Sequence, residues 1–422
     1  MSDVTMTNQT QAQKLDSVAA RKARIMGGIL IALALLVIFV LHVVPGESAT
    51  FRLTTRRDAI QIPDLVVPGA FNYVAAALLA FLGVRQFLQG GARWTSLSLG
   101  VGLAILVMAF LVWATAGKAF NLTSMLQAAV LASVPIALGG LAGVMSERVA
   151  VVNIAIEGML LAGAFAGALI GSLLGGWIGL VAAILVGGSF GLLLAVLVVT
   201  FRMDQIIAGV VINLFVLGVT SYVSSQVFSE YRFLNNAKVF RQWEIPFLSD
   251  IPVLGPMLFD QNLFVYGAFI LVGIATYYLF YTKNGLRARA VGEHPRAADT
   301  LGVDVYVTRY VHVTIAGMVA GFGGAFFTLG NVGRFEENMT NGRGYIGLAA
   351  MIFGRWHPVG ALSAALIFGF ADSIQRKLAL LNTPIPSEFL AMAPYIATII
   401  VVAGLVGRSR PPAADGKPYV KE

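Results

Sequence analysis

Apolar runs of membrane-spanning length, separated by short polar segments, cover most of this chain of 422 residues. Each run is close to the roughly 20 residues that an α-helix needs to cross about 30 Å of hydrocarbon. The pattern predicts an all-α, polytopic α-helical integral membrane protein with about 10–12 membrane segments. The regions 122–174 and 345–374 are expected to contain broken or re-entrant helices. The runs lie near 25–44, 66–83, 97–116, 122–145, 149–174, 176–200, 205–228, 262–282, 309–331, 345–374 and 389–407.

The composition supports the same class of protein. Hydrophobic residues make up 58% of the chain and charged residues only 12%, whereas an ordinary globular chain has about 25% charged residues. The net charge of +8 arises from Lys and Arg that gather between apolar runs, which is the positive-inside pattern of membrane proteins rather than a nucleic-acid-binding surface. Because the chain has no cysteine and its four histidines are scattered, we expect no metal site and no cofactor in this chain.

The distribution of basic residues predicts the orientation in the membrane. The loop 283–308 and the C-terminal tail 408–422 are basic, so we place both in the cytoplasm. The polar N-terminal tail, residues 1–24, is placed on the same side, and residues 1–20 are expected to be disordered. Segment 229–261 carries more acidic than basic residues and several prolines, which suits an extracytoplasmic loop.

The membrane part of the chain divides in two by composition. Residues 25–120 end in a plain apolar run and are predicted to form an added three-span extension. Residues 121–407 are dense in Gly, Asn and Ser and are predicted to form a transport core. Glycines recur every four residues from Gly163 to Gly179, and small residues at this spacing let helices approach closely. The glycine pattern therefore favours a compact helical bundle and says nothing about a substrate.

Polar side chains inside the apolar runs are candidates for function, because an unsatisfied polar group in hydrocarbon is costly. Asn153 and Glu157 stand four residues apart, which places them on one face of a helix, and Asn213 lies centrally in its run. We predict that Asn153, Glu157, Asn213 and Asn331 line the substrate path. The alternative is structural: Glu157 is satisfied by Arg148 or Asn153 between helices, and Asn213 is equally open to either role.

A helix break is expected where Arg355, Trp356, His357 and Pro358 interrupt an apolar run. Pro358 cannot donate a backbone hydrogen bond, and it disfavours helical geometry at the preceding residue. The break fits a discontinuous helix whose free backbone groups form a site at the membrane midplane. It fits a simple cytoplasmic turn equally well.

The cytoplasmic loop 283–308 differs from an ordinary linker. It combines a Gly hinge, basic residues and a Gly-Glu-His-Pro turn, and Pro295 suits the first turn of a short helix. A short helix at the cytoplasmic surface can receive mechanical force from a soluble motor protein. Taken alone, the loop also fits a solvated basic linker. The predicted coupling residues are Gly285, Arg287, Arg289, Gly292, Glu293, His294, Pro295, Ala297 and Ala298.

Sequence motifs for chemistry on a substrate are absent. The sequence has no P-loop to cradle ATP phosphates, no nucleophile elbow and no H-E-x-x-H pattern. We therefore expect a transport subunit rather than an enzyme. Its energy would come from a partner protein or from an ion gradient.

Four sequence blocks, in this order, resemble the permease subunits of ABC importers in the ribose and branched-chain-amino-acid permease superfamily. The greatest similarity is to the second permease of nucleoside importers of the guanosine/uridine type. The resemblance covers the chain from about residue 121 to the C-terminus and leaves 1–120 as an extension. The blocks are 138–159, which ends in NIAIEGM; 204–214, which begins DQIIAGVVIN; 284–303, which contains VGEHPRAA; and 342–361, which contains RGYIGLAAMIFGRWHP.

The resemblance implies a permease of the bacterial cytoplasmic (inner) membrane that translocates nucleosides. The implied partners are a second permease in a heterodimer, a cytoplasmic ATPase with duplicated nucleotide-binding domains that uses ATP and Mg²⁺, and an extracytoplasmic substrate-binding lipoprotein. In this family the loop that matches 285–302 docks in a groove of the ATPase. Two alternatives stay open: an ABC permease for a sugar or another small solute, and an ion-coupled secondary transporter that uses Glu157 or Asp372.

Overall fold

A computed structural model describes residues 2–44, 46–54, 60–89, 92–381, 392 and 410–421. The chain forms two compact units, which are described separately. Unit 1 consists of residues 1–123 and 377–387, and unit 2 consists of residues 124–376 and 388–422. The predicted membrane run at 389–407 falls almost entirely outside the described residues.

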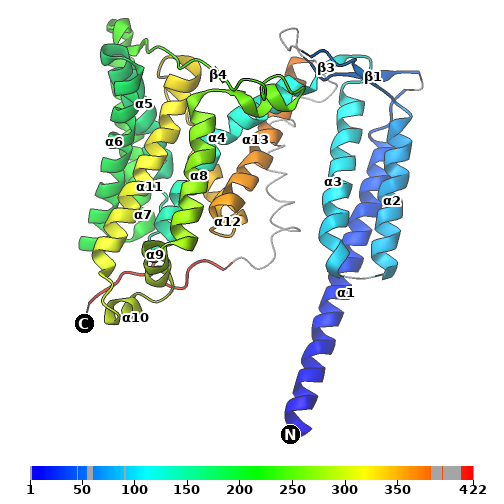
Figure 1. The fold of residues 1–422 in the computed structure, drawn as a ribbon, viewed down its shortest axis with the longest axis horizontal. Helices are drawn as coiled ribbons and strands as arrows, with labels where there is room; N and C mark the ends of the chain where they lie inside the picture. The colour runs from blue at the N-terminus through cyan, green and yellow to red at the C-terminus, as the bar shows by residue number, and fades with distance from the viewer. Residues whose placement is uncertain are drawn as a thin grey trace. The chain divides into compact units, whose positions relative to one another are not determined.

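Unit 1 is built on three helices, α1 (Ser2–Phe39), α2 (Phe71–Gln89) and α3 (Ala92–Ala114), that pack side by side (Figure 1). Leu30, Val37 and Leu79 are among the buried side chains between these helices. The polar residue Asn72 is also buried here, and its amide donates to the backbone oxygens of Leu41, at 2.6 Å, and of Ala109. These bonds satisfy the side-chain nitrogen inside an otherwise apolar core, whereas the side-chain oxygen is buried without a hydrogen-bond partner among the described residues.

A small sheet closes one end of unit 1, and the sequence analysis did not anticipate it. It contains β1 (Ser48–Arg52), β2 (Leu65–Pro68) and β3 (Ala119–Asn121) in the order β2-β1-β3. Strand β1 pairs antiparallel with β2 and parallel with β3, and it places Phe51 opposite Phe120. The two rings meet edge to face with centroids 6.1 Å apart.

The expected disorder of the N-terminal tail is wrong, because α1 begins at Ser2. The sequence from Ser2 to Met26 contains neither Gly nor Pro and is rich in Ala, Gln, Lys and Arg. These residues favour a helix even where the surface is polar. The polar stretch and the apolar run after it therefore form one continuous helix.

Unit 2 holds the long helices of the predicted core. Two short helices, α9 and α10, connect α8 to α11 at one end of the unit, which we call the α9 end (Figure 1). The elements are α4 (Leu122–Glu147), α5 (Ile156–Leu174), α6 (Gly176–Ala195), η1 (Val196–Thr200), α7 (Gln205–Val223), η2 (Ser224–Phe228), η3 (Arg232–Asn235), β4 (Trp243–Glu244), η4 (Gly255–Phe259), β5 (Asp260–Gln261), α8 (Leu263–Tyr281), α9 (Lys283–Glu293), α10 (Pro295–Thr300), α11 (Val305–Phe327), η5 (Thr328–Val332), α12 (Arg343–Phe353) and α13 (Pro358–Leu380).

The all-α, polytopic membrane class is confirmed. Among the described residues, nine helices are long and apolar enough to cross a membrane. Two shorter apolar helices cover Ala23–Phe39 and Arg343–Phe353. The chain is therefore a multi-pass membrane protein.

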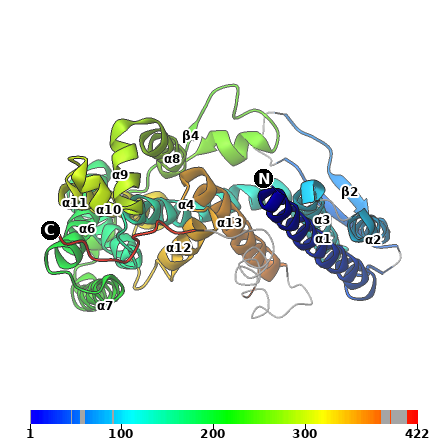
Figure 2. The ribbon, with the colours of Figure 1, turned by 90° about the horizontal axis from the view of Figure 1, so that it is seen from below.

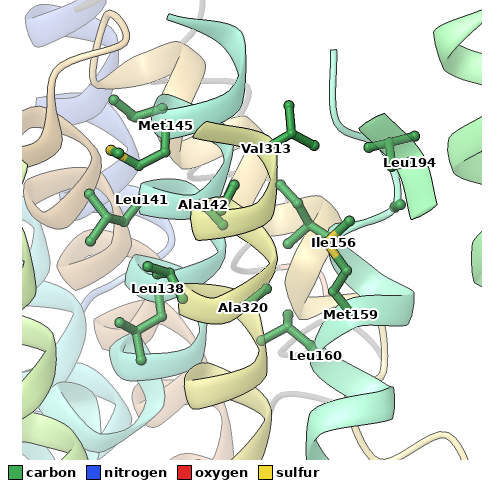
Figure 3. Close-up of a cluster of buried hydrophobic side chains, with 14 of the residues drawn as sticks. Leu138, Leu141, Ala142, Met145, Ile156, Met159, Leu160, Leu194, Val313 and Ala320 are labelled. Carbon is green, nitrogen blue, oxygen red and sulfur yellow. The ribbon is translucent and has the colours of Figure 1, made fainter. Parts of the chain in front are cut away.

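The core of unit 2 forms where α4, α5, α6 and α11 meet. Figure 3 shows Leu138 of α4 near Ala320 of α11 and Leu160 of α5, with Met145 farther along α4. The predicted glycine packing is confirmed on α6, because a Cβ atom on Gly187 would collide with the backbone of α11. Small residues here let the two helix backbones touch directly, which strengthens van der Waals packing in a membrane.

The expected helix breaks are confirmed in both long regions. The α4–α5 connector, residues 148–155, separates two helices and contains Ala150 with a φ of 61°. The chain also turns sharply between α12 and α13, where Arg355 and Trp356 have φ values of 56° and 54°. At Arg355–Pro358 a turn separates α12 from α13, and Pro358 is the first residue of α13.

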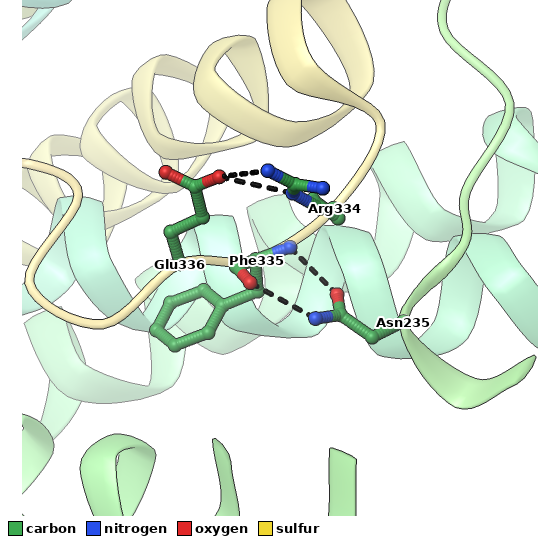
Figure 4. Close-up of polar contacts among 4 residues, drawn as sticks. All are labelled: Asn235, Arg334, Phe335 and Glu336. Carbon is green, nitrogen blue, oxygen red and sulfur yellow. Dashed lines mark hydrogen bonds and ion pairs between the residues drawn. The ribbon is translucent and has the colours of Figure 1, made fainter. Parts of the chain in front are cut away.

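A second irregular segment, residues 333–342, leads from η5 into α12. Asn235 fixes the start of this segment: its amide donates to the Phe335 oxygen at 2.9 Å and accepts from the Phe335 nitrogen at 2.6 Å (Figure 4). Gly342, with a φ of 78°, ends the segment at the start of α12. Irregular backbone among membrane helices is tolerated where other protein groups satisfy its hydrogen bonds. Helix α12, which follows this segment, is only 11 residues long.

Candidate functional site

Glu157, in the first turn of α5, binds the N-terminus of α12. Its carboxylate oxygens accept hydrogen bonds from the backbone N–H groups of Gly342, at 2.8 Å, and Gly344, at 2.6 Å. The first N–H groups of a helix have no partner within the helix and carry the positive end of its dipole, so a carboxylate there is favourable. The partners of Glu157 are thus backbone groups of α12, and not Arg148 or Asn153 as the structural alternative supposed.

Asn213 of α7 joins the beginnings of α5 and α12. Its side-chain oxygen accepts from the Gly158 backbone N–H at 2.7 Å. Its side-chain nitrogen donates to the Ile154 oxygen at 2.8 Å and to the Tyr345 hydroxyl at 3.0 Å. The buried amide therefore joins its own helix, α7, to two segments far from it in the sequence: residues 154–158 and the first turn of α12.

Tyr345, in the first turn of α12, is a residue that the sequence analysis did not select. The residue is 47% exposed although its hydroxyl bonds to the buried Asn213. The only signal in the sequence was its position within the block RGYIGLAAM. The structure therefore brings Glu157, Asn213 and an open aromatic face together at the start of α12.

Asn153 and Asn331 do not join this group. The expectation that Asn153 shares a helix face with Glu157 is wrong, because α5 begins only at Ile156 and Asn153 lies in the α4–α5 connector. Asn153 is fully buried there, and its side-chain oxygen has no hydrogen-bond partner among the described residues. Asn331 is exposed in η5, at the far end of α11.

Asp372 of α13, the second carboxylate considered for an ion-coupled mechanism, lies between two arginines. The distance from its oxygen to the Arg376 guanidinium is 3.0 Å, and to that of Arg343 it is 3.8 Å. The guanidinium of Arg343 also lies over the Phe327 ring, 5.6 Å from the centroid. Asp372 thus serves as a counter-charge to these arginines.

A second polar group, the Trp356 cluster, lies at the α9 end and consists of Glu147, Arg148, Phe280, Trp356 and His357. The Trp356 indole N–H donates to the Glu147 carboxylate at 2.6 Å, and Arg148 Nε donates to the Trp356 backbone oxygen at 2.8 Å. The Phe280 ring stacks on His357 with centroids 4.5 Å apart and lies under the Arg148 guanidinium. The cluster ties the end of α4 to the α12–α13 turn.

Burial acts on the basic groups of this cluster. Desolvation lowers the pKa of Arg148, and the neighbouring charge of Arg289 lowers it further. Desolvation also lowers the pKa of His357, and the positive charge of Arg148 acts in the same direction. Burial and the nearby positive charge thus both disfavour the protonated form of His357.

The predicted coupling segment forms α9 and α10. The hydroxyl of Thr282 accepts from the Gly285 N–H at 3.1 Å and caps α9, and His294 Nδ1 accepts from the Ala297 N–H at 3.1 Å and caps α10. Pro295 is the first residue of α10, as predicted. Among the predicted coupling residues, Gly285, Gly292 and Ala298 are buried; Arg289 and Pro295 are half-buried; and Arg287, Glu293, His294 and Ala297 are exposed.

Helix α9 lies directly against the Trp356 cluster. The Arg289 guanidinium lies over the Phe280 ring, 5.0 Å from its centroid. A Cβ atom on Gly292 would collide with the backbone oxygen of Arg148. Because Gly292 has no side chain, α9 can touch the start of the α4–α5 connector, so a displacement of α9 acts on that connector directly.

Comparison with known proteins identifies the family. Residues 124–406 match the family model described as branched-chain amino acid transport system / permease component. The chain is 41% identical to the guanosine ABC transporter permease protein NupQ of Bacillus subtilis, over 71% of this chain and 97% of that protein. It is 38% identical to the nucleoside ABC transporter permease protein NupC of Lactococcus lactis, over 68% of this chain and 94% of that protein.

More distant relatives include the putative glucose ABC transporter permease protein TsgC13 of Haloferax volcanii, at 32% identity over 68% of this chain and 92% of that protein. No solved structure matches the chain. The family match covers the described helices of unit 2 and leaves most of unit 1 outside it. On this evidence the chain belongs to the family of branched-chain amino acid transport system permease components.

Proposed function

We propose that the chain is the permease subunit of an ABC importer that carries nucleosides across the bacterial inner membrane. The observation that carries the proposal is the similarity to two nucleoside permeases, at 41% and 38% identity, over nearly their whole lengths. The predicted coupling helices and the discontinuous segment before α12 support a transport role. Transport rather than catalysis is the function of these relatives.

The group at the start of α12 suits a nucleoside, which is neutral and amphipathic. The half-exposed Tyr345 ring offers an apolar face for a nucleobase, and its hydroxyl is oriented by Asn213. Aromatic walls with a few fixed polar groups are typical of sites for such ligands. Glu157 acts indirectly in this scheme, because its carboxylate holds the α12 N-terminus that carries Tyr345.

The exposed face of α9 and α10 is the proposed contact with the ATPase. Leu286 and Leu301 are 60% and 85% exposed there, and the basic Arg287 lies on the same short segment. Exposed apolar side chains rimmed by polar ones are typical of protein interaction sites. ATP binding and hydrolysis in the partner would move this segment and thereby the Trp356 cluster.

The proposed assembly contains two different permeases, an ATPase with duplicated nucleotide-binding domains and a substrate-binding lipoprotein. Bacillus subtilis also has a guanosine ABC transporter permease protein NupP, to which this chain is only 26% identical. The unequal similarity to NupQ and NupP supports a heterodimer in which this chain takes the NupQ-like place.

A reconstituted complex tests the proposal. The permease pair, the ATPase and the lipoprotein are placed in proteoliposomes, and uptake of labelled guanosine and uridine is followed with and without ATP. We expect uptake that requires ATP hydrolysis. Uptake that continues without a nucleotide would instead support an ion-coupled carrier.

A sugar is the second candidate cargo, because of the similarity to TsgC13 of Haloferax volcanii. Excess unlabelled glucose is added to the same proteoliposomes during guanosine uptake. We expect no competition if nucleosides are the cargo. ATP-dependent glucose uptake without nucleoside uptake would favour the sugar permease.

A further inference from the structure

The C-terminal segment, residues 410–421, lies along α9, α10 and the start of α11 (red in Figures 1 and 2). The Ala414 backbone N–H donates to the Gly292 oxygen at 3.0 Å, and the Ala413 N–H donates to the Glu293 carboxylate at 3.3 Å. The oxygen of Gly292 is among the carbonyl groups that a helix leaves free at its C-terminus. The segment thus completes the hydrogen bonding of the last turn of α9.

The same segment covers a buried arginine of α11. Arg309 is only 1% exposed; its Nε donates to the Val149 oxygen at 3.1 Å, and its Nη1 is 3.4 Å from the Lys417 oxygen. The Asp415 carboxyl attracts this guanidinium and interacts electrostatically with Glu147 at the end of α4. Removing the segment would take the Lys417 oxygen and the Asp415 carboxyl away from Arg309. The loss would be unfavourable, because a buried charge without partners is costly.

The end of the segment is attached to α10 and α11. The Tyr419 ring packs on Tyr306 with centroids 5.5 Å apart, and the Lys421 N–H is 3.4 Å from the Tyr306 hydroxyl. The Lys421 ammonium is 3.2 Å from the Asp299 carboxylate of α10. Contacts made within residues 412–421 therefore join α9, α10 and α11 to one another.

We propose that the C-terminal segment is a positioning element for energy coupling, which holds α9 and α10 on the ends of α4 and α11. The inference rests on the proposed role of α9 and α10 as the ATPase contact. With the segment in place, movement of α9 is passed to the α4–α5 connector and the Trp356 cluster. Without it, α9 and α10 move more independently, so ATP is hydrolysed with less transport.

The test uses the complete reconstituted complex with a permease that ends at Pro411. We expect nucleoside transported per ATP hydrolysed to fall at least fivefold, while the ATPase still copurifies with the permease. A ratio equal to that of the wild type overturns the proposal. Val420→Ala is the control on the same segment, because Val420 is 45% exposed, and an equal loss in this variant also overturns it.

A second variant covers the case in which the truncated chain fails to insert. Ala414→Pro removes the one N–H that bonds to Gly292 and leaves the rest of the chain intact. We expect the same fall in the transport ratio, together with faster hydrogen exchange in residues 412–421. An unchanged ratio in a variant whose segment does exchange faster overturns the proposal.

The proposed function is judged separately on the wild-type complex. If that complex hydrolyses ATP but takes up no nucleoside, the substrate assignment fails. The positioning role is then measured as stimulation of the ATPase by the binding lipoprotein. Loss of this stimulation in the truncated variant supports the positioning role, and retained stimulation overturns it.

Discussion

The substitution Glu157→Gln measures how strongly the carboxylate holds α12. In the wild type both carboxylate oxygens accept, one from Gly342 and one from Gly344, and the side chain is only 8% exposed. Glutamine keeps one acceptor and turns a donor toward the other N–H. The loss of one charge-assisted hydrogen bond costs about 1.5–3 kcal/mol, and the lost charge at the helix N-terminus adds about 0.3–1 kcal/mol.

A total of about 2–4 kcal/mol corresponds to a roughly 30- to 1000-fold larger equilibrium constant for opening of the α12 N-terminus, and so to faster hydrogen exchange there. Hydrogen exchange followed by mass spectrometry, on a peptide that covers residues 342–346, measures this change. The matched control is Glu336→Gln, whose exposed carboxylate pairs with Arg334 at 2.7 Å (Figure 4). A surface pair of this kind is worth at most about 1 kcal/mol. Exchange in the Glu157 variant that is no faster than in the control would refute the assignment.

Three further predictions follow from the same contacts. Gly292→Trp should abolish ATP-driven uptake but not membrane insertion, because the tryptophan side chain would collide with the Arg148 backbone. Its control is Gly273→Trp, at a glycine with open space around it, and this variant should transport normally. Tyr345→Ala should lower nucleoside uptake about tenfold, and Tyr345→Phe, which keeps the ring, should retain more of the wild-type uptake. The measurement is the initial rate of labelled nucleoside uptake by each variant. Burial raises the pKa of Asp415 to about 6 from the ordinary 3.8, so protonation of Asp415 favours the attached segment, and this contribution is lost as the pH rises from about 4 to about 6. A fluorophore on Val420→Cys, in a chain without other cysteines, should therefore gain mobility between about pH 4 and about pH 6. The gain should be smaller with Asp415→Asn, which leaves Glu147 and Arg309 beside that position.

The sequence predicts those parts of the fold that depend on local chemistry. The membrane helices follow from the length of the apolar runs, and Pro295 and Pro358 each begin a helix, because proline lacks the N–H that the first turn leaves unpaired. Glycine spacing predicts close helix packing, and the contact of α6 with α11 is an example of it. These features are decided within a few residues along the chain.

The details of the site depend on contacts between distant residues, which one sequence does not display. Glu157 is separated from its partner Gly342 by 185 residues, and helical periodicity says nothing about that bond. The same periodicity wrongly placed Asn153 on α5, because the connector continues to Ala155. The C-terminal segment reads as a polar tail, since its contacts with Gly292 and Arg309 arise only after folding.

Helix α12 is held at both ends by carboxylates that flank the α4–α5 connector. Glu157, just after the connector, binds the N–H groups at the start of α12, and Glu147, just before it, binds the Trp356 indole that follows its end. A short helix fixed at both ends to one connector moves with it as a single body. Gly292 brings α9 against that same connector. A displacement of α9 is therefore expected to reach Tyr345 without any change within α12. In the proposed coupling scheme, this rigidity would let an 11-residue helix carry motion from the ATPase contact to the substrate path.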